Sequence, residues 1–365
     1  MRFVSSQAVS VLDDSALRAA VLPLGVQPWR AAQIQRALWQ PYIGGFADIR
    51  QLPAGLRARL VATFAFSTVV VTDEVEADHG HTVKLLCRLN DGLTVEAVAM
   101  ETPATGRAVR RATACVSTQV GCAVGCPFCA TGQLGLLRNC TAAEIVDQVR
   151  AAKAALYRRG FGSITHVVYM GMGEPLANYD ATLHSLRVLV SGARIGARRI
   201  TVSTSGVAPA IDRLAADAPP VTLAISLHAA TDELRNRLVP LNRAHPIAEL
   251  VAAGVRYAVR TGRRLSLEWC LIGGVNDSTE QAERLRELAR AAAAHVNVIP
   301  MNRIPASRWG PPEPDVTRRF LERLRGVRVT VRDTRGSDVD AACGQLRAQL
   351  ETRRRLRADG TLGPQ

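Results

Sequence analysis

The chain has 365 residues, of which 47% are hydrophobic and 21% are charged. This length suits two or three domains, or one barrel with an appendage, and the composition excludes a disordered or fibrous protein. No run approaches ~18 uninterrupted apolar residues, and residues 1–14 lack the apolar core of a signal peptide, so we expect a cytoplasmic protein that does not span a membrane.

Positive charges exceed negative charges by 14 at neutral pH, which is typical of proteins with a polyanionic partner such as nucleic acid. Almost every cation is arginine, since Lys84 and Lys153 are the only lysines. A GC-rich genome that encodes arginine in place of lysine accounts for that preference. It does not account for the excess over acidic residues, so charge alone leaves nucleic-acid binding open.

Residues 1–92 are expected to form a small helical domain followed by a β linker. Helical periodicity covers residues 15–21 and 28–39, and Pro28 suits the first turn of a helix. Strand-like stretches follow at 68–76, 82–89 and 93–100, with turn residues at 90–92. A stability appendage and a protein-docking module are the alternatives for this region.

From about residue 111 onwards, strand and helix patterns alternate. Strands are predicted at residues 113–119, 164–170, 199–203, 221–227, 264–271, 296–299 and 327–332. The first helix between them has a capping-box pattern, Thr141 with Glu144, and an apolar stripe from Ile145 to Leu156. Such alternation predicts a parallel sheet, open or closed into a barrel, with sites at the carboxyl ends of its strands. The arginine-rich stretch 346–359 is expected to be a basic surface helix.

The eight cysteines carry the sharpest local signal. In a chain without a secretory signal, clustered thiols indicate metal or redox chemistry before disulfides. Cys122, Cys126 and Cys129 have a C-x3-C-x2-C spacing, which suits a loop wrapped around an inorganic core. A structural zinc usually takes four protein ligands, whereas three thiolates on a 4Fe-4S cluster leave one iron free for a small molecule. A zinc site completed elsewhere and three unligated thiols are the alternatives.

This spacing resembles that of the radical S-adenosylmethionine enzymes, and the resemblance extends to further motifs. Five stretches occur in order: RATACVSTQVGC at 111–122, GMGEPL at 171–176, STSG at 203–206, ISLH at 225–228 and RGSDVDAACGQL at 335–346. Together they resemble the RlmN family of adenine-C2 RNA methyltransferases, whose relative Cfr methylates adenine C8. The resemblance covers residues 93–346 and is weaker over the N-terminal part.

The resemblance implies an α/β fold with a partial (βα)6 radical S-adenosylmethionine barrel over residues 93–346. A small N-terminal helical RNA-binding domain over 1–92 and a basic tail over 347–365 would flank it. The implied cofactors are a 4Fe-4S cluster, bound by Cys122, Cys126 and Cys129, and S-adenosylmethionine. The implied partners are 23S rRNA, tRNA and an electron-donor protein such as flavodoxin, and we expect a monomer.

The family mechanism assigns catalytic roles to three residues. One S-adenosylmethionine methylates Cys343, and a second is cleaved to a radical that takes hydrogen from the methylated Cys343, whose carbon then adds to adenine. Cys115 attacks the Cys343 sulfur, which releases the product and leaves a disulfide, and Glu96 is the implied general base. A radical route is intelligible because adenine C2 is electron-poor and carries no nucleophile for a methylsulfonium.

The resemblance also implies which residues bind S-adenosylmethionine after successive strands. They are Gly173 and Glu174, expected at the cofactor's amino group, and Ser203, Ser226, Leu227, His228 and Asn302. The alternatives are an ordinary strand-ending turn and buried Ser or His side chains bonded to backbone. Asn302 stands in Met-Asn-Arg-Ile-Pro, where family members often have Asn-Pro.

Several alternatives stay open at this level. The motifs do not separate C2 from C8 methylation, and a non-enzymatic, metal-bearing RNA-binding protein needs only the charge and the cysteine triplet. The arginine-rich segment 101–110, longer than the family norm, is expected either to extend RNA contact or to form a solvated loop. Cys87, Cys140 and Cys270 have no matching role; Cys140 is expected to be structural and Cys270 to lie in the core.

Overall fold

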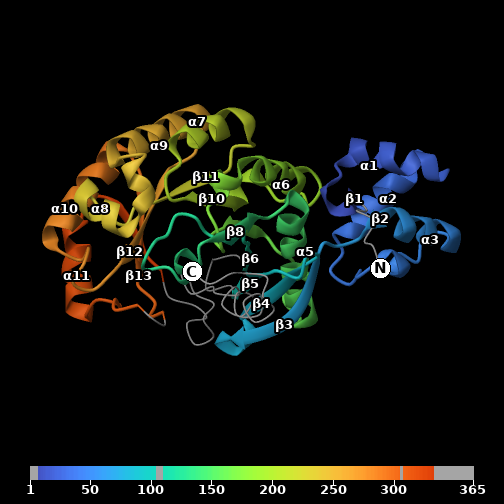
Figure 1. The fold of residues 1–365 in the computed structure, drawn as a ribbon, viewed down its shortest axis with the longest axis horizontal. Coiled ribbons are helices and arrows are strands. Elements are labelled where there is room, and N and C mark those ends of the chain that lie inside the picture. Colours follow the sequence, from blue (N-terminus) through green and yellow to red (C-terminus); the bar gives the residue numbers. More distant parts are fainter. Residues whose placement is uncertain (1–6, 104–109, 305–306, 333–365) are drawn as a thin grey trace, which may run out of the picture.

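The computed structural model describes residues 7–103, 110–304 and 307–332. Its N-terminal part is a small helical unit at the right of Figure 1, with helices α1 (Asp14–Val21), α2 (Pro28–Leu38) and α3 (Ala54–Thr63). Both predicted helices are confirmed, and Pro28 occupies the first turn of α2 as expected. Two short strands, β1 (Gln7–Ala8) and β2 (Phe64–Ala65), pair in parallel and close the unit.

A ten-stranded sheet dominates the rest of the described chain, in the order β14-β13-β12-β11-β10-β9-β6-β5-β4-β3. Its antiparallel edge is formed by β3 (Val69–Ala77), β4 (Thr82–Leu89) and β5 (Thr94–Thr102), which joins β6 (Arg111–Cys115). The stretches expected to form a linker are therefore members of the main sheet. The linker interpretation was wrong because seven residue pairs hold β4 to β5, and hydrogen bonding of that extent builds a sheet.

The remaining strands are parallel and alternate with helices. They are β6, β9 (His166–Tyr169), β10 (Ile200–Thr204), β11 (Thr222–Ser226), β12 (Ser266–Leu271), β13 (His295–Pro300) and β14 (Arg328–Val331). The helices between them are α5 (Ala142–Arg158), α6 (Tyr179–Ser191), α7 (Ala208–Asp217), α8 (Asp232–Leu238), α9 (Ile247–Thr261), α10 (Thr279–Ala291) and α11 (Pro314–Arg323). In the described residues this makes a curved, open (βα)6 arrangement that ends on β14, which confirms the predicted partial barrel (Figure 1).

The strand predicted over residues 113–119 is broken in the structure. β6 ends at Cys115, and the next residues form β7 (Gln119–Gly121), which pairs with β8 (Leu136–Asn139) across the short helix α4 (Ala130–Leu134). The break arises because the backbone N–H of Ser117 turns to the side chain of Gln148 at 2.8 Å. The chain therefore leaves the sheet where the loop that bears the cysteine triplet begins.

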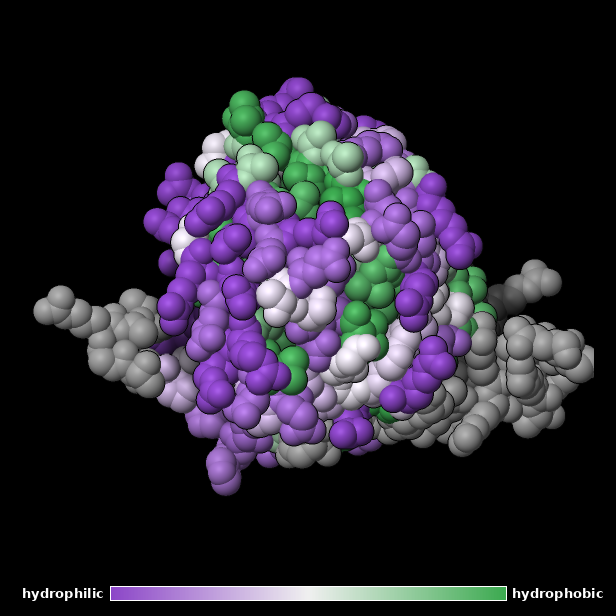
Figure 2. Space-filling view, turned by 90° about the vertical axis from the view of Figure 1, so that its left-hand side faces the viewer, coloured by the Kyte–Doolittle hydropathy of each residue, from purple (hydrophilic) through white to green (hydrophobic). Residues whose placement is uncertain are grey.

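Strands of the barrel alternate between an apolar face and a polar face. On β10, β11 and β12 the residues packed into the hydrophobic core under the helices include Val202, Leu223 and Trp269. Their neighbours Thr201, Thr222 and Ser266 line a hollow on the inner side. Figure 2 shows the outer face around the C-terminal helices, which is largely hydrophilic with a few apolar patches. The core thus lies between sheet and helices, whereas the barrel interior is polar.

Helix α5 connects the N-terminal unit to the barrel. It begins with the predicted capping box, since Thr141 Oγ1 accepts the Glu144 N–H and the Glu144 carboxylate accepts the Thr141 N–H. Further along, Arg150 donates to the carbonyls of Leu38 and Phe66, at 3.0 and 2.7 Å. These bonds fix the two parts side by side. No helix in the part of the chain that the structure describes is long and apolar enough to cross a bilayer.

Candidate cofactor site and adjoining chamber

The cysteine triplet lies on the loop between β7 and α4. Gly125 adopts a φ of +72°, which a residue with a side chain rarely adopts, and so allows the chain to turn between Cys122 and Cys126. The loop is folded tightly, because a Cβ added at Gly132 would lie 2.6 Å from the carbonyl oxygen of Cys126. The sequence between the cysteines thus permits a compact loop at the end of the barrel.

All three cysteines face one cavity of about 170 Å3 at the carboxyl ends of the strands. The same cavity is lined by six of the residues expected to bind S-adenosylmethionine: Gly173, Glu174, Ser203, Ser226, His228 and Asn302. These residues come from four separate segments of the chain, so the fold gathers what the sequence keeps far apart. Leu227 does not line the cavity; its side chain is buried, and its N–H bonds the carbonyl of Glu268 at 3.0 Å.

The donor set fits an iron–sulfur cluster better than a single ion. Burial raises the pKa of the Cys122 thiol to about 12, while N–H groups of Val124 and Gly125 hydrogen-bond its sulfur and oppose that rise. Backbone N–H groups aimed at a cysteine sulfur are a usual feature of iron–sulfur sites. Among the described residues no three His, Cys, Asp or Glu side chains gather to hold one metal ion. Zinc needs its sulfurs ~2.3 Å from one centre, whereas cluster cysteines bind different irons.

Glu174 is a buried carboxylate, 2% exposed, at the wall of the cavity. Its two oxygens accept the backbone N–H groups of Leu176 and Ser205, at 2.9 and 2.6 Å. Burial raises the pKa of Glu174, and these hydrogen bonds counteract that effect. A carboxylate fixed in this way fits the ammonium group of an amino-acid ligand, because a cation offsets its burial.

The glycines of the GMGEPL motif serve the packing of the protein itself. A Cβ added at Gly171 would lie 2.6 Å from the carbonyl oxygen of Val116, and one at Gly173 would lie 2.5 Å from Cβ of Gln119. Gly173 also has a φ of +99°. The side chain of Gln119 then accepts the N–H of Glu174 at 2.8 Å. The glycines therefore let the motif lie directly on the segment that leads to the cysteine loop.

Ser203 and Ser226 lie on neighbouring strands, with their hydroxyl oxygens 3.2 Å apart. The side chain that supports this region is Arg235 of α8, which is fully buried. Its guanidinium donates to the carbonyls of Ser205, Ser226 and Leu227, at 2.6, 3.1 and 3.0 Å. The sequence analysis missed Arg235, since one arginine among many on a surface-like helix gives no signal of burial.

His228 adopts a φ of +59° directly after β11. Its Nδ1 accepts the backbone N–H of Cys270 at 2.9 Å, and its ring meets Phe128 of the cysteine loop edge to face. Cys270 was expected in the core, which is wrong: its residue lies on the inner face of β12, half-buried, and lines the cofactor cavity. Cys140 is 2% exposed and does not line the cavity, as a structural cysteine should.

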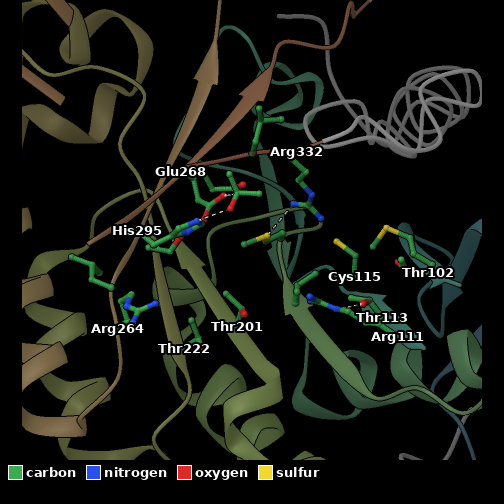
Figure 3. Close-up of a pocket in the computed structure, with 18 of the residues that line it drawn as sticks. Thr102, Arg111, Thr113, Cys115, Thr201, Thr222, Arg264, Glu268, His295 and Arg332 are labelled. Carbon is green, nitrogen blue, oxygen red and sulfur yellow. Dashed lines mark hydrogen bonds between the residues drawn. The ribbon is translucent and has the colours of Figure 1, made fainter. Parts of the chain in front are cut away.

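A second, larger hollow of about 900 Å3 occupies the barrel interior next to the cofactor cavity. The two share the residues Met170, Glu268, Ile299 and Asn302 as walls. Figure 3 shows Arg111, Thr113 and Cys115 on one side of this chamber, facing Glu268 and His295 on the other. Barrel interiors are usually packed with branched aliphatic side chains, so a hollow lined by hydroxyl, amide and cationic groups indicates a polar ligand.

Of the catalytic residues expected from the resemblance, Cys115 lines this chamber and Glu96 lies on a strand face that borders it. Cys115 is buried there. In the sheet, Val98 of β5 pairs with Cys115, and Glu96 precedes Val98 by two residues on β5, so Glu96 and Cys115 belong to the same face. Cys343 and the basic tail lie outside the described residues, as does most of segment 101–110. Of that segment, Glu101 is buried and its carboxylate bonds both His81 and Arg110.

Comparisons with known proteins agree with this geometry. Residues 116–294 match the Radical SAM superfamily. A probable dual-specificity RNA methyltransferase RlmN of Thermobifida fusca is 46% identical over 347 residues, covering 92% of this chain and 93% of that protein. The corresponding protein of Mycolicibacterium paratuberculosis is 47% identical over 348 residues, covering 93% and 94%.

A solved structure points the same way. The crystal structure of a radical SAM methyltransferase from Sphaerobacter thermophilus matches with a TM-score of 0.89 and 47% identity, covering 94% of this chain and 99% of that one. The alternative of a non-enzymatic RNA-binding protein is therefore wrong, and the cofactors are a 4Fe-4S cluster and S-adenosylmethionine. The chain belongs to the RlmN family of radical S-adenosylmethionine RNA methyltransferases.

Proposed function

We propose that this enzyme methylates carbon C2 of an adenine in 23S rRNA and in tRNA, through a methylated-cysteine intermediate and with two molecules of S-adenosylmethionine. The relative in Thermobifida fusca is named a dual-specificity RNA methyltransferase, which supports two kinds of RNA substrate. The motif around Cys343 supports the cysteine intermediate. The enzyme would act in the cytoplasm, where both RNAs occur, as a monomer served by an electron donor such as flavodoxin.

The observation that carries the proposal is the shared wall between the cofactor cavity and the polar chamber. Met170 and Glu268 border both spaces, so a ligand in one lies next to a ligand in the other. A nucleotide turned out of its stack would fit a chamber of this kind, because enzymes that act on bases receive them in enclosed pockets. Hydroxyl groups of Thr113 and Thr201 suit its sugar, and the chamber arginines suit its phosphates.

The described side chains have distinct tasks in this scheme. Cys122, Cys126 and Cys129 would hold the cluster, and Glu174 would receive the amino group of S-adenosylmethionine. When bound, the cluster and S-adenosylmethionine supply the carbon-centred radical that the chemistry needs. Gly173, Ser203, Ser226, Leu227, His228 and Asn302 would contact the cofactor, Leu227 through its backbone.

Product release would depend on Cys115 and Glu96. Glu96 takes the proton from the ring carbon that carries the new methylene group, and the ring returns one electron to the electron-transfer chain that supplied it, which restores the aromatic ring. The Cys115 thiolate attacks the sulfur of Cys343 as the carbon–sulfur bond to the product breaks, and the departing methylene carbon keeps the bonding electron pair and takes up a proton to become the methyl group. A disulfide forms, and two electrons are needed to reduce it. The position of Cys115 on the chamber wall supports this role, because a thiol there reaches a substrate-bound sulfur without entering the cofactor cavity.

Anaerobic reconstitution with iron and sulfide, followed by incubation with S-adenosylmethionine, a reductant and RNA fragments, tests the proposal. We expect 5'-deoxyadenosine together with C2-methyladenosine, identified by mass spectrometry of the nucleosides. C8-methyladenosine would favour the Cfr-like alternative. The absence of both methylated nucleosides in a preparation with intact cluster would contradict the proposal.

A further inference from the structure

The inference concerns Lys84 and rests on the proposed role of Glu96. Lys84 lies on β4, with its side chain only 15% exposed, and its Nζ is 3.8 Å from Oε1 of Glu96, whose side chain is 7% exposed. We propose that Lys84 is a positioning residue for the reaction: its ammonium group holds the Glu96 carboxylate in its ionised form beside the chamber, ready to accept the substrate proton.

The register of the sheet places these groups in one functional row. Lys84 pairs with Val98 across β4 and β5, and Val98 pairs with Cys115 across β5 and β6. Paired residues of antiparallel strands point to the same face. Lys84, Glu96 and Cys115 therefore share the face that borders the chamber. A positive charge here serves both groups proposed to act on the substrate, since it favours a carboxylate and a thiolate alike.

Lysine is rare in this chain, so its presence at position 84 is informative. The chain contains 46 Lys and Arg residues, and all but Lys84 and Lys153 are arginine. Both lysines are partly buried, and each ammonium group meets one particular oxygen: that of Glu96 for Lys84, and the carbonyl of Trp39 for Lys153. A compact ammonium group on a flexible stem fits such a site, whereas a guanidinium group requires a planar space.

Lys84 acts on a carboxylate whose backbone is held in place. The backbone of Glu96 is fixed, because its carbonyl accepts the Ser117 hydroxyl at 2.5 Å and its N–H bonds the sulfur of Met172. By register, the described titratable or charged groups on the same face as Glu96 also include Asp73 of β3, which pairs with Leu86 opposite Glu96, Arg88 of β4 and Cys115 of β6, whereas Glu74 and Cys87 lie on the opposite face. Burial, and then the charges of Glu96 and Glu74, raise the pKa of Cys87 to about 12, so the charge of Glu96 reaches β4.

The test compares rate against pH for K84M, K84R and wild-type holoenzyme, with RNA fragments as substrate. Loss of the cation makes the Glu96 carboxylate easier to protonate, so the acidic limb of the rate–pH profile of K84M should move to higher pH by about one to three units. K84R retains the charge and should keep the wild-type limb. K153M is the matched control, because it removes the other lysine at a site remote from the chamber and should not move the limb.

Two outcomes separate this inference from the proposed function. An inactive E96Q with a K84M profile identical to wild type would overturn the role of Lys84 and leave the base intact. An active E96Q would contradict the proposed base itself. Iron content and thermal midpoint are measured for every variant, and K84Q replaces K84M if the latter does not retain the cluster.

Discussion

The Nδ1 atom of His228 accepts the backbone N–H of Cys270 at 2.9 Å, which joins the end of β11 to β12 beside the cofactor cavity. An imidazole that accepts at Nδ1 carries its proton on Nε2 and is neutral. Burial, and then the nearby charge of Arg235, lower the pKa of His228 to about 3. The ring is therefore a neutral donor at the cavity wall throughout the physiological range.

This relationship predicts a dependence of stability on pH. The folded pKa of His228 lies below its unfolded value of about 6.5, so the unfolded state takes up a proton more readily as pH falls. The contribution of neutral His228 to the free energy of unfolding is therefore complete above pH 6.5 and is lost as pH falls. The slope approaches about 1.4 kcal/mol per pH unit below pH 6. H228N retains an acceptor and tolerates the positive φ, but does not titrate. Between pH 7.5 and 5 we expect the thermal midpoint of H228N to fall less than that of wild type; parallel curves would contradict the assignment.

The GMGEPL loop gives a second prediction, based on space. Gly173→Ala would set a Cβ 2.5 Å from Gln119 at a φ of +99°, and the loop must shift to relieve this contact. We expect G173A to lose about 1–3 kcal/mol of stability, and to bind S-adenosylmethionine at least about tenfold more weakly, since 1.4 kcal/mol is tenfold. Equilibrium dialysis of the reconstituted protein measures the affinity.

Gly196→Ala is the matched control for that change. Gly196 has an ordinary φ and nothing within 4 Å of the added Cβ, so the variant should bind S-adenosylmethionine like wild type. If G173A bound the cofactor as well as G196A does, the close packing of the loop would be irrelevant to the site.

The sequence predicted the architecture well because its signals are local. The capping box at Thr141 and the proline at the start of α2 act through neighbouring residues, and both appear in the structure as expected. The placement of β3 and β4 could not be inferred in this way, because partners in a sheet are chosen by distant residues. Nothing within 68–89 indicates whether these strands pair with each other alone or with the barrel.

The sequence of the barrel strands does contain a signal for the chamber. Buried parallel strands are usually continuous apolar runs, yet β10 reads Ile-Thr-Val-Ser-Thr and β12 reads Ser-Leu-Glu-Trp-Cys-Leu. Such alternation predicts that one face of the strands does not pack in a core. By contrast, the burial of Arg235 depends on carbonyls at the ends of two other strands, and no pattern within α8 reveals them.

Arg235 supplies a third prediction. R235M keeps the length of the side chain but leaves the carbonyls of Ser205 and Ser226 without this donor. We expect a loss of about 3 kcal/mol or more, because buried acceptors without partners each cost about 1–3 kcal/mol. R256M removes an exposed pair with Asp212 and should leave the thermal midpoint almost unchanged. Equal midpoints for the two variants would show that the buried arginine does not support the strand ends.

The cysteines allow a direct test of the cluster. C126A removes one thiolate of the triplet, so the reconstituted protein should lose its visible absorption, its iron and its cleavage of S-adenosylmethionine. C140A removes a buried thiol away from the cavity and should retain all three. C270A, on the cavity wall but outside the triplet, should retain the iron. A colourless C270A would mean that Cys270 takes part in binding the cluster.

The last prediction concerns a polar groove on the N-terminal unit, with a volume of about 670 Å3 and Arg36, Tyr42 and Arg50 on its walls. Tyr42 is 60% exposed, and exposed aromatic rings beside arginines suit unstacked bases and phosphates. If this groove binds RNA, R36Q/R50Q should weaken RNA binding and reduce the slope of log affinity against log salt concentration by about one to two units. Filter binding at several salt concentrations measures that slope.

Cleavage of S-adenosylmethionine without RNA should be unchanged, because the groove lies outside the barrel. An unchanged slope would exclude these arginines from phosphate contact and assign the unit to packing against α5.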